Sequence, residues 1–400
     1  MSAEIAESAN RDANTDADQP DVLAEARALA ERFSAAGDEI EAARRVPKEH
    51  SDAMARAGIY RMFIPEAIGG LEVSPLVGSR VFETLAQGEA SCGWVAFIGA
   101  TSGTTLARVP EDVARECFPN PETLIAGVFA PNGRAERVEG GFQVNGRWQW
   151  GSGTENADWV LGGSLLKEGG EAMLDAHGNP RQHMMLFPAS DIEFLDTWHV
   201  TGLKGTGSTD FQVTDCFVPE GRAVGFLQPK NPDRPLYQFP NFTFLALGIA
   251  AVTLGIARSA IDELVSLAQS KKRVGSGSTM AEKAHTQLEV AGAEANLRSA
   301  RAFYYDAIEA AWTYAERGDK VPMELRRDLR LATNHAVSSS VKTVDAMYTL
   351  AGGSSVYSTS KLQRHFRDVH VATQHIMVGP NITELVGKLY LGVPANAAML

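Results

Sequence analysis

Cysteine is scarce in this chain of 400 residues, and its three cysteines, Cys92, Cys117 and Cys216, lie far apart. Because no two of them form a CxxC pair, the sequence predicts neither a disulfide framework nor a zinc site. Scattered single cysteines are typical of proteins from a reducing compartment, so we expect this protein to work in the cytoplasm.

Basic residues are also too few to balance the acidic ones, since 37 Lys and Arg against 49 Asp and Glu give a net charge of -12. This charge argues against nucleic acid or an anionic membrane as the main partner. The apolar run at residues 244–254 is too short to cross a bilayer. Residues 1–20 lack the basic start and apolar core of a signal peptide, and their polar, acidic composition predicts a disordered tail.

Three stretches with different patterns follow this tail. Residues 21–122 repeat apolar and charged residues at a helical period, which predicts an N-terminal helical domain. Residues 123–235 hold short β-type runs separated by Gly, Asn, Asp and Pro, which predicts a small β domain. Residues 236–400 are helical again, and long helices with short links predict a bundle. The candidate bundle helices cover residues 245–269, 280–316, 323–352 and 361–391.

Near the C-terminus, a Gly352-Gly353 turn follows the third of these helices, and the pair Arg367-Asp368 comes soon after. The turn, the pair and their spacing resemble the acyl-CoA dehydrogenase superfamily. The resemblance implies an α+β fold with N-terminal helices, a middle β barrel and a C-terminal four-helix bundle. It also implies that Gly352 and Gly353 bind the cofactor, and that Arg367-Asp368 is an internal ion pair that orients the last helices.

The segment between the turn and the pair departs from the dehydrogenase pattern. In many members a glutamate there is the base that removes the α-proton of an acyl thioester, and at the matching spacing this chain has Thr359. A threonine cannot accept that proton. The resemblance therefore implies the flavin scaffold without its best-known chemistry, with Thr359 left to face the substrate.

A second match is the run Trp148 to Gly153, which reads WQWGSG. In the superfamily a Trp and a Thr at this place line the flavin ring, and the resemblance maps them to Trp150 and Ser152. A flat aromatic ring can pack against the isoalloxazine, and a hydroxyl can bond N5 in either redox state. The order Trp, Gly, Ser, Gly resembles the flavin-dependent monooxygenase branch more than the dehydrogenases. The alternative is a strand with packed tryptophans and a turn serine.

Three histidines, His365, His370 and His375, lie five residues apart near the C-terminus. This spacing does not place them on one helix face, so we expect no metal site. The monooxygenase branch resembles this chain in having a histidine near His375, which implies that this imidazole bonds the substrate or a flavin peroxide. His370 is a weaker candidate for a substrate contact, and a purely structural role is the alternative for both.

Two further residues complete the expected site. Arg273 aligns with a family arginine that reaches the dinucleotide of a neighbouring subunit, where a guanidinium would bind phosphate. The alternative is a solvated helix end. Several related hydroxylases have a histidine in the helix equivalent to residues 91–103, and Thr101 or Ser102 is the expected polar contact in its place. The alternative is a core helix whose hydroxyls bond their own backbone.

These residues predict a flavin-dependent monooxygenase that uses reduced flavin, FAD or FMN, and O2 through a C4a-hydroperoxide to oxygenate a small aromatic or heteroatom-containing substrate. No Gly-x-Gly-x-x-Gly after a strand offers a nicotinamide site, so a separate reductase is expected to supply the reduced flavin. The resemblance also implies a homotetramer. Two alternatives are an acyl-CoA dehydrogenase with a displaced base and a non-catalytic flavoprotein. Candidate displaced bases are Glu289, Glu294, Asp306 and Glu309.

Overall fold

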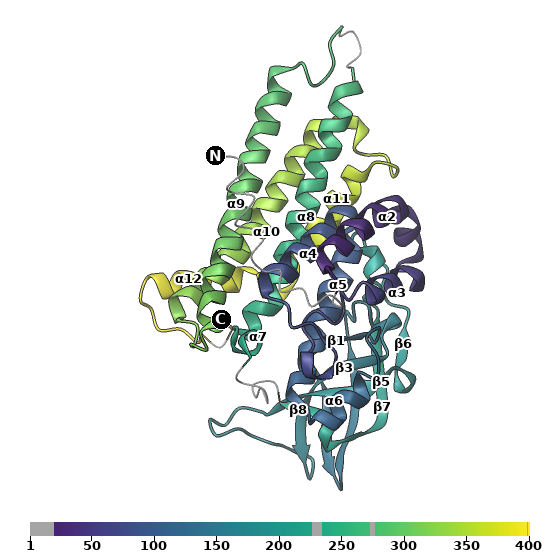
Figure 1. The fold of residues 1–400 in the computed structure, drawn as a ribbon, viewed down its shortest axis with the longest axis vertical. Coiled ribbons are helices and arrows are strands. Elements are labelled where there is room, and N and C mark those ends of the chain that lie inside the picture. Colours follow the sequence, from purple (N-terminus) through teal and green to yellow (C-terminus); the bar gives the residue numbers. More distant parts are fainter. Residues whose placement is uncertain (1–19, 226–233, 273–276, 398) are drawn as a thin grey trace.

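The computed structural model describes residues 20–225, 234–272, 277–397 and 399–400, so Arg273 and nearly all of the expected tail lie outside the described residues. Figure 1 shows a bundle of long helices at one end, a β sheet at the other, and most of the N-terminal helices between them. The N-terminal helices are α2 (Val22–Ala43), α3 (Lys48–Arg56), α4 (Pro75–Gly88), α5 (Ala90–Gly103) and α6 (Glu111–Cys117).

The strands form one mixed sheet in the order β6-β7-β2-β1-β3-β5-β8, with β4 paired to β3. β1 and β3 run parallel, and the other neighbouring pairs are antiparallel. Because β2 ends at Trp148, the WQWGSG loop leaves the sheet there, and Gly153 comes to lie against Val95 of α5. The strands are β1 (Ile125–Val138), β2 (Gly141–Trp148), β3 (Trp159–Glu168), β4 (Glu171–Ala172), β5 (Gln182–Pro188), β6 (Glu193–Leu195), β7 (Asp210–Pro219) and β8 (Ala223–Gly225).

The first strand contains both a proline and a glycine, Pro131 and Gly133. β1 continues through residues 129–133 and shifts its register against β3 between Val128 and Gly133. A bulge accommodates the proline, which has no N–H to donate to a ladder. Gly133 fits because a Cβ there would meet Trp148 at 2.4 Å.

The central helix of the bundle is α8, which packs against α4, α5, α10 and α11. By length and composition α8 is apolar enough to cross a membrane, which corrects the expectation that no apolar segment is long enough. However, 83% of its most apolar window is buried inside the protein, as in the core helix of a bundle. The helices of this part are α7 (Pro235–Gln238), α8 (Asn241–Ser270), α9 (Ala284–Glu316), α10 (Met323–Ala351), α11 (Lys361–Ala372) and α12 (Pro380–Tyr390).

The sequence predicted a single helix over residues 361–391, and this prediction is wrong. α11 ends at Ala372, a short 3-10 turn η9 covers Ile376–Val378, and α12 starts at Pro380. Pro380 occupies the first turn of α12, where its missing N–H is tolerated, whereas in a continuous helix it would break the backbone ladder. The break places His375 at the start of η9, where its side chain accepts a hydrogen bond from the Met377 N–H.

The Arg367-Asp368 pair joins three parts of the molecule instead of forming an ion pair with itself. The Arg367 guanidinium lies 2.7 Å from the Glu41 carboxylate of α2, and the Asp368 carboxylate accepts the Leu203 N–H at 2.6 Å. Burial raises the pKa of Glu41, but hydrogen bonds from cationic side chains, Arg367 among them, outweigh it and lower the pKa to about 2. The segment at Gly202 packs directly on α11, since a Cβ on Gly202 would lie 2.4 Å from the Arg367 backbone.

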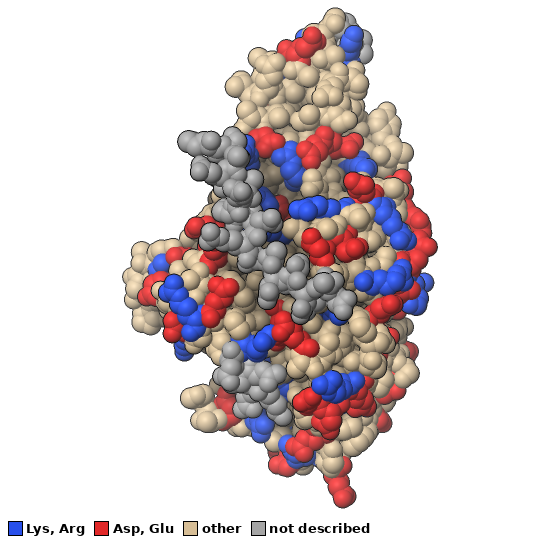
Figure 2. Space-filling view, viewed as in Figure 1, with Lys and Arg blue, Asp and Glu red and all other residues tan. Residues whose placement is uncertain are grey.

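Charged side chains are unevenly spread over the surface. On the face in Figure 2, basic and acidic side chains are intermixed over the middle of the molecule, and the upper part of the bundle carries few of either. Single-sign patches are therefore not a feature of this face.

We expect Gly202→Ala to lower the free energy of unfolding by about 1–3 kcal/mol, because the new methyl group must displace the α11 backbone. Urea denaturation measures the change. Gly292→Ala is the control, since Gly292 is exposed within α9 with open space around it, and alanine there should leave stability unchanged or raise it by up to about 1 kcal/mol. Equal loss in both variants would contradict the close approach.

Candidate functional site

The WQWGSG loop is held in a fixed, unusual conformation. Trp150 has a φ of 65°, a left-handed value that is rare for a non-glycine residue, and its side chain is 68% exposed. Backbone bonds fix the loop to the glycine-rich segment 202–209, which precedes β7. Gly151 N–H donates to Thr209 O and Gly153 N–H donates to Thr206 O, each at 3.0 Å. A strained residue with an exposed ring indicates a surface prepared for a flat ligand.

A chain of hydrogen bonds runs from α5 through this loop into the segment 202–209. Trp94 Nε1–H donates to Ser152 Oγ at 3.1 Å. Ser152 Oγ lies 2.6 Å from Ser208 Oγ, which lies 2.6 Å from Thr206 Oγ1. Thr206 Oγ1 donates to Leu203 O at 2.8 Å. All three hydroxyl groups are buried.

The chain has a direction because each hydroxyl has one proton. Since the Thr206 proton goes to the Leu203 carbonyl, Thr206 accepts from Ser208, and Ser208 in turn accepts from Ser152. The indole N–H of Trp94 can only donate, and it uses one lone pair of Ser152 Oγ. Ser152 is therefore left with one free lone pair and no free proton, which makes it an acceptor.

His375 lies beside this chain. Its ring and that of Trp94 meet edge to face, with centroids 6.0 Å apart. Burial and the nearby positive charge of Arg330 lower the pKa of His375 to about 4, so the imidazole is neutral at physiological pH. Because Nδ1 accepts the Met377 N–H, the single ring proton lies on Nε2, which is left as a donor.

Trp94 and Ser208 complete the site but were not among the predicted site residues. Trp94 lies in an almost uncharged helix, whose composition is typical of a buried core helix, and the Trp94 side chain is only 6% exposed. Ser208 lies in the glycine-rich segment 202–209, and glycines there are equally expected of a tight turn. A lone Trp and Ser carry no spacing pattern, so only the fold shows that they meet Ser152.

Other predicted residues lie outside the cluster of Trp94, Ser152 and His375. Thr101 donates its hydroxyl to Phe97 O at 2.6 Å, so this side chain is bonded to its own helix, as the alternative had it. His370 forms a 2.9 Å pair with Asp345 between α11 and α10. Gly352 and Gly353 are exposed at the end of α10, where Gly352 has a φ of 58°.

Thr359 lines a wide surface groove of its own. The groove lies between α2, the segment 199–204 and α11, and Arg44 and Arg364 share its wall. No contact among the described residues links Thr359 to Ser152 or His375. Its role as a substrate contact therefore stays a prediction.

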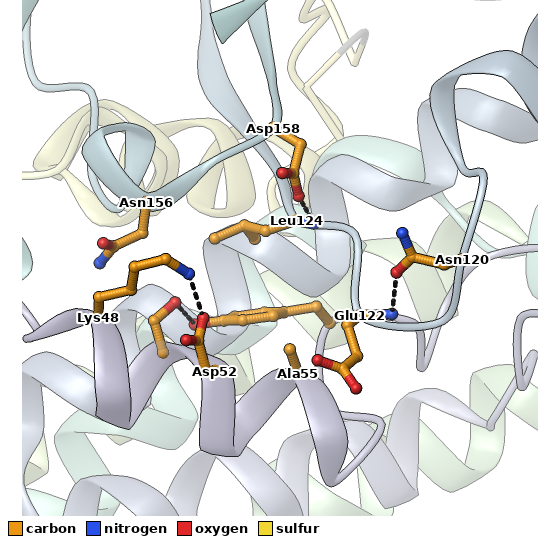
Figure 3. A pocket seen from close by; sticks show the side chains of 10 residues that line it. Lys48, Asp52, Ala55, Asn120, Glu122, Leu124, Asn156 and Asp158 are labelled. Carbon is orange, nitrogen blue, oxygen red and sulfur yellow. Dashed lines mark hydrogen bonds and ion pairs between the residues drawn. The ribbon is translucent and has the colours of Figure 1, made fainter.

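A second hollow, shown in Figure 3, lies between α3 and the loops before β1 and β3. Its polar groups are largely satisfied by one another: Lys48 pairs with Asp52 at 2.7 Å, and Asp158 accepts the Leu124 N–H at 2.8 Å. The Asn120 side chain likewise accepts a backbone N–H of its own loop. These bonds close a loop against α3, which is a structural role.

The cluster fits the flavin that the resemblance implies. Trp150 offers an exposed ring for packing, and the buried Ser152, two residues further along the loop, offers a lone pair. The N5–H of a reduced flavin needs such an acceptor, whereas N5 of an oxidised flavin needs a donor. The residues that would hold the ring are Trp150, Ser152, Trp94 and His375, which come from all three parts of the fold.

Comparison with known sequences identifies relatives over most of the chain. The family model for the acyl-CoA dehydrogenase N-terminal domain matches residues 16–116, and that for the C-terminal domain matches residues 247–380. Indole-3-acetate monooxygenase of Pseudomonas putida is 36% identical over 88% of this chain and 89% of its own length. The oxygenase component of the FADH2-dependent resorcinol hydroxylase of a Rhizobium species is 29% identical over 91% of this chain and 92% of its own length.

Comparison with solved structures agrees. The 3-HSA hydroxylase of a Rhodococcus species superposes with a TM-score of 0.88 at 26% identity, over 96% of this chain and all of that one. XiaF of a Streptomyces species, solved in complex with FADH2 and glycerol, has a TM-score of 0.85 at 25% identity, over 93% of this chain and 95% of that one. The expected three-part architecture is thereby confirmed.

We expect the His375 imidazole to titrate near pH 4, well below an ordinary histidine, because burial and Arg330 both oppose its charge. Histidine NMR with His375→Gln for assignment measures the midpoint. The unfolded chain binds this proton near pH 6.5 and the folded chain does not, so the free energy of unfolding should fall as pH drops from about 6.5 toward 4. An ordinary midpoint would show that the ring is solvated.

Proposed function

The chain belongs to the acyl-CoA dehydrogenase family, in its branch of flavin-dependent monooxygenases, and from this premise we propose that it inserts one oxygen atom from O2 into a small aromatic substrate. Its named relatives act on indole-3-acetate and resorcinol, which share an aromatic ring. The observation that carries the proposal is the acceptor state of Ser152, which suits a flavin that arrives reduced.

Reduced flavin bound at Trp150 would supply the activation of O2. The chain's own residues would orient the reactants and exclude water. Ser152 Oγ would accept a hydrogen bond from the N5–H group of the flavin, and Trp150 would pack on the face of the flavin ring. The Nε2–H of His375 would donate to an oxygen atom on the substrate or on the flavin. The buried apolar wall around Trp94 would keep water out.

The dehydrogenase alternative requires a carboxylate that can remove a carbon-bound proton. Its candidates lie on α9, where Glu289, Asp306 and Glu309 are exposed, and Glu294 is paired with Arg258 at 2.7 Å. The charged group that acts on His375 is a cation, Arg330. A non-catalytic flavoprotein would share the exposed ring at Trp150 and the oriented acceptor at Ser152. The relatives, a monooxygenase and a hydroxylase, favour the oxygenase over both alternatives.

The remaining partners follow from the same premise. A separate reductase would deliver the reduced flavin, as the name of the resorcinol enzyme's oxygenase component implies for that system. A homotetramer is supported by large apolar side chains that are exposed on the bundle, Leu288 of α9 and Val356 and Tyr357 after α10. A cytoplasmic location is supported by three free cysteines.

We expect Trp150→Ala to weaken flavin binding about three- to tenfold, since the packing of an aromatic pair is worth about 0.5–1.5 kcal/mol beyond its buried area. Trp150→Phe should retain most of the affinity, and neither variant relieves the left-handed backbone at this position. Flavin fluorescence titration of the two variants measures the difference. Equal affinity in wild type and both variants would show that the ring of Trp150 does not touch flavin.

The function is tested by supplying chemically reduced flavin and 18O2 to the protein with a panel of phenols, indoles and arylalkanoates. We expect one 18O atom in the product, and no desaturation of an acyl-CoA panel. Ser152→Ala should shift the outcome from product toward hydrogen peroxide by about fivefold, because a neutral hydrogen bond of about 1 kcal/mol is lost. Desaturated acyl-CoA, or no labelled product from the whole panel, would refute the proposal.

A further inference from the structure

A buried guanidinium without a partner lies near the proposed site. Arg330, on α10, has no exposed surface, and none of its three nitrogen atoms has a hydrogen-bond partner among the described residues. Burial alone acts on its pKa, which falls only to about 10, so the side chain stays charged at physiological pH. Buried charges in proteins are normally paired, and an unpaired one is strongly destabilising.

The charged groups on the neighbouring turns of α10 are already engaged elsewhere. Arg326, one turn earlier, donates to the backbone O of Leu400. Arg327 and Asp328 form a 2.9 Å pair, which also receives the Tyr390 hydroxyl of α12. Among the described residues, Arg330 has no hydrogen-bond partner, and no carboxylate contributes to its pKa.

The location of Arg330 connects it with the cluster that would hold the flavin. α10 packs against η9, the turn that His375 begins, and after burial it is the positive charge of Arg330 that lowers the pKa of His375. His375 in turn meets Trp94 edge to face, and Trp94 donates to Ser152. The order Ser152, Trp94, His375, Arg330 thus leads from the flavin side into the bundle, where a bound substrate would extend.

We propose that Arg330 is the anchor for a carboxylate on the substrate, and that the protein oxygenates an aromatic acid of the arylalkanoate class. This inference rests on the proposed function and deepens it. A planar guanidinium with five N–H donors matches a carboxylate in a two-pronged pairing. The aromatic ring would lie at His375 and the flavin, and the acidic side chain would reach into the bundle. Substrate binding would then supply the anion that the free protein lacks.

A neutral aromatic substrate of the same shape would leave Arg330 unpaired, so the site would discriminate by charge. Sites built around a polar group reject analogues that cannot pair with it far more strongly than apolar pockets reject a change of size. The probes are therefore phenylacetate and 1-naphthylacetate against their neutral amides, phenylacetamide and 1-naphthylacetamide.

Calorimetric titration of the full-length protein with these four compounds tests the anchor without turnover. We expect each acid to bind at least about a hundredfold more tightly than its amide. In Arg330→Gln the acid should lose this advantage, and Arg330→Lys should keep part of it through its point charge. Arg326→Gln is the matched control, because it removes a partly buried cation one turn away, and it should keep the preference for acid.

A second readout separates an anchor from a merely structural arginine. A carboxylate paired with Arg330 would offset the charge that opposes protonation of His375, so the NMR midpoint of His375 should rise when naphthylacetate binds and stay unchanged with naphthylacetamide. Arg330→Gln should raise that midpoint in the free protein. Circular dichroism and thermal unfolding check that each variant is folded.

The outcomes distinguish this inference from the function on which it rests. If acids and amides bind alike, or if Arg330→Gln keeps the preference for acid, the anchor is refuted even when labelled oxygen enters neutral aromatics. If acids bind through Arg330 but no labelled oxygen enters any aromatic compound, the proposed function fails and the anion site stands.

Discussion

The hydrogen-bond chain from Trp94 through Ser152 and Ser208 to Thr206 is the constraint on which the rest of the site depends. It ties α5 to two loops of the β sheet, and it consumes every hydroxyl proton within itself. A buried chain that is fully satisfied is rigid, whereas one missing partner would leave buried polar atoms unpaired. The same bonds that hold the domains together therefore decide that Ser152 presents a lone pair to the ligand.

The interruption between α11 and α12 serves the same site from the other side. Pro380 prevents a continuous helix, and the resulting turn brings His375 to the edge of Trp94. Asp368 and Arg367 hold the preceding helix against α2 and the segment at Leu203, where the hydroxyl chain ends. One end of the hydroxyl chain, at Leu203, and the helix that precedes His375 are thus held by the contacts of Asp368 and Arg367.

The three-part fold and two of the site residues could be predicted from the sequence, because each depends on a pattern within a short segment. The three-part order followed from composition and periodicity, and the WQWGSG run identified Trp150 and Ser152 by a motif. The hydrogen-bond partners of Ser152 could not be predicted from the sequence. Trp94 lies 58 positions away and Ser208 lies 56 positions away, and no spacing rule joins them to Ser152. The unpaired state of Arg330 was equally hidden, because a charged residue within a helix usually faces water. Long-range contacts and burial, and not residue types, were the missing information.

The central claim is that the protein is built to receive a reduced flavin. Its most direct test is the affinity of the wild-type protein for reduced and for oxidised flavin, measured under strictly anaerobic conditions with FAD and with FMN. The acceptor state of Ser152 predicts that the reduced form binds about fivefold more tightly, the value of one neutral hydrogen bond of about 1 kcal/mol. An oxidised flavin that binds as tightly as the reduced one, or more tightly, would contradict the account.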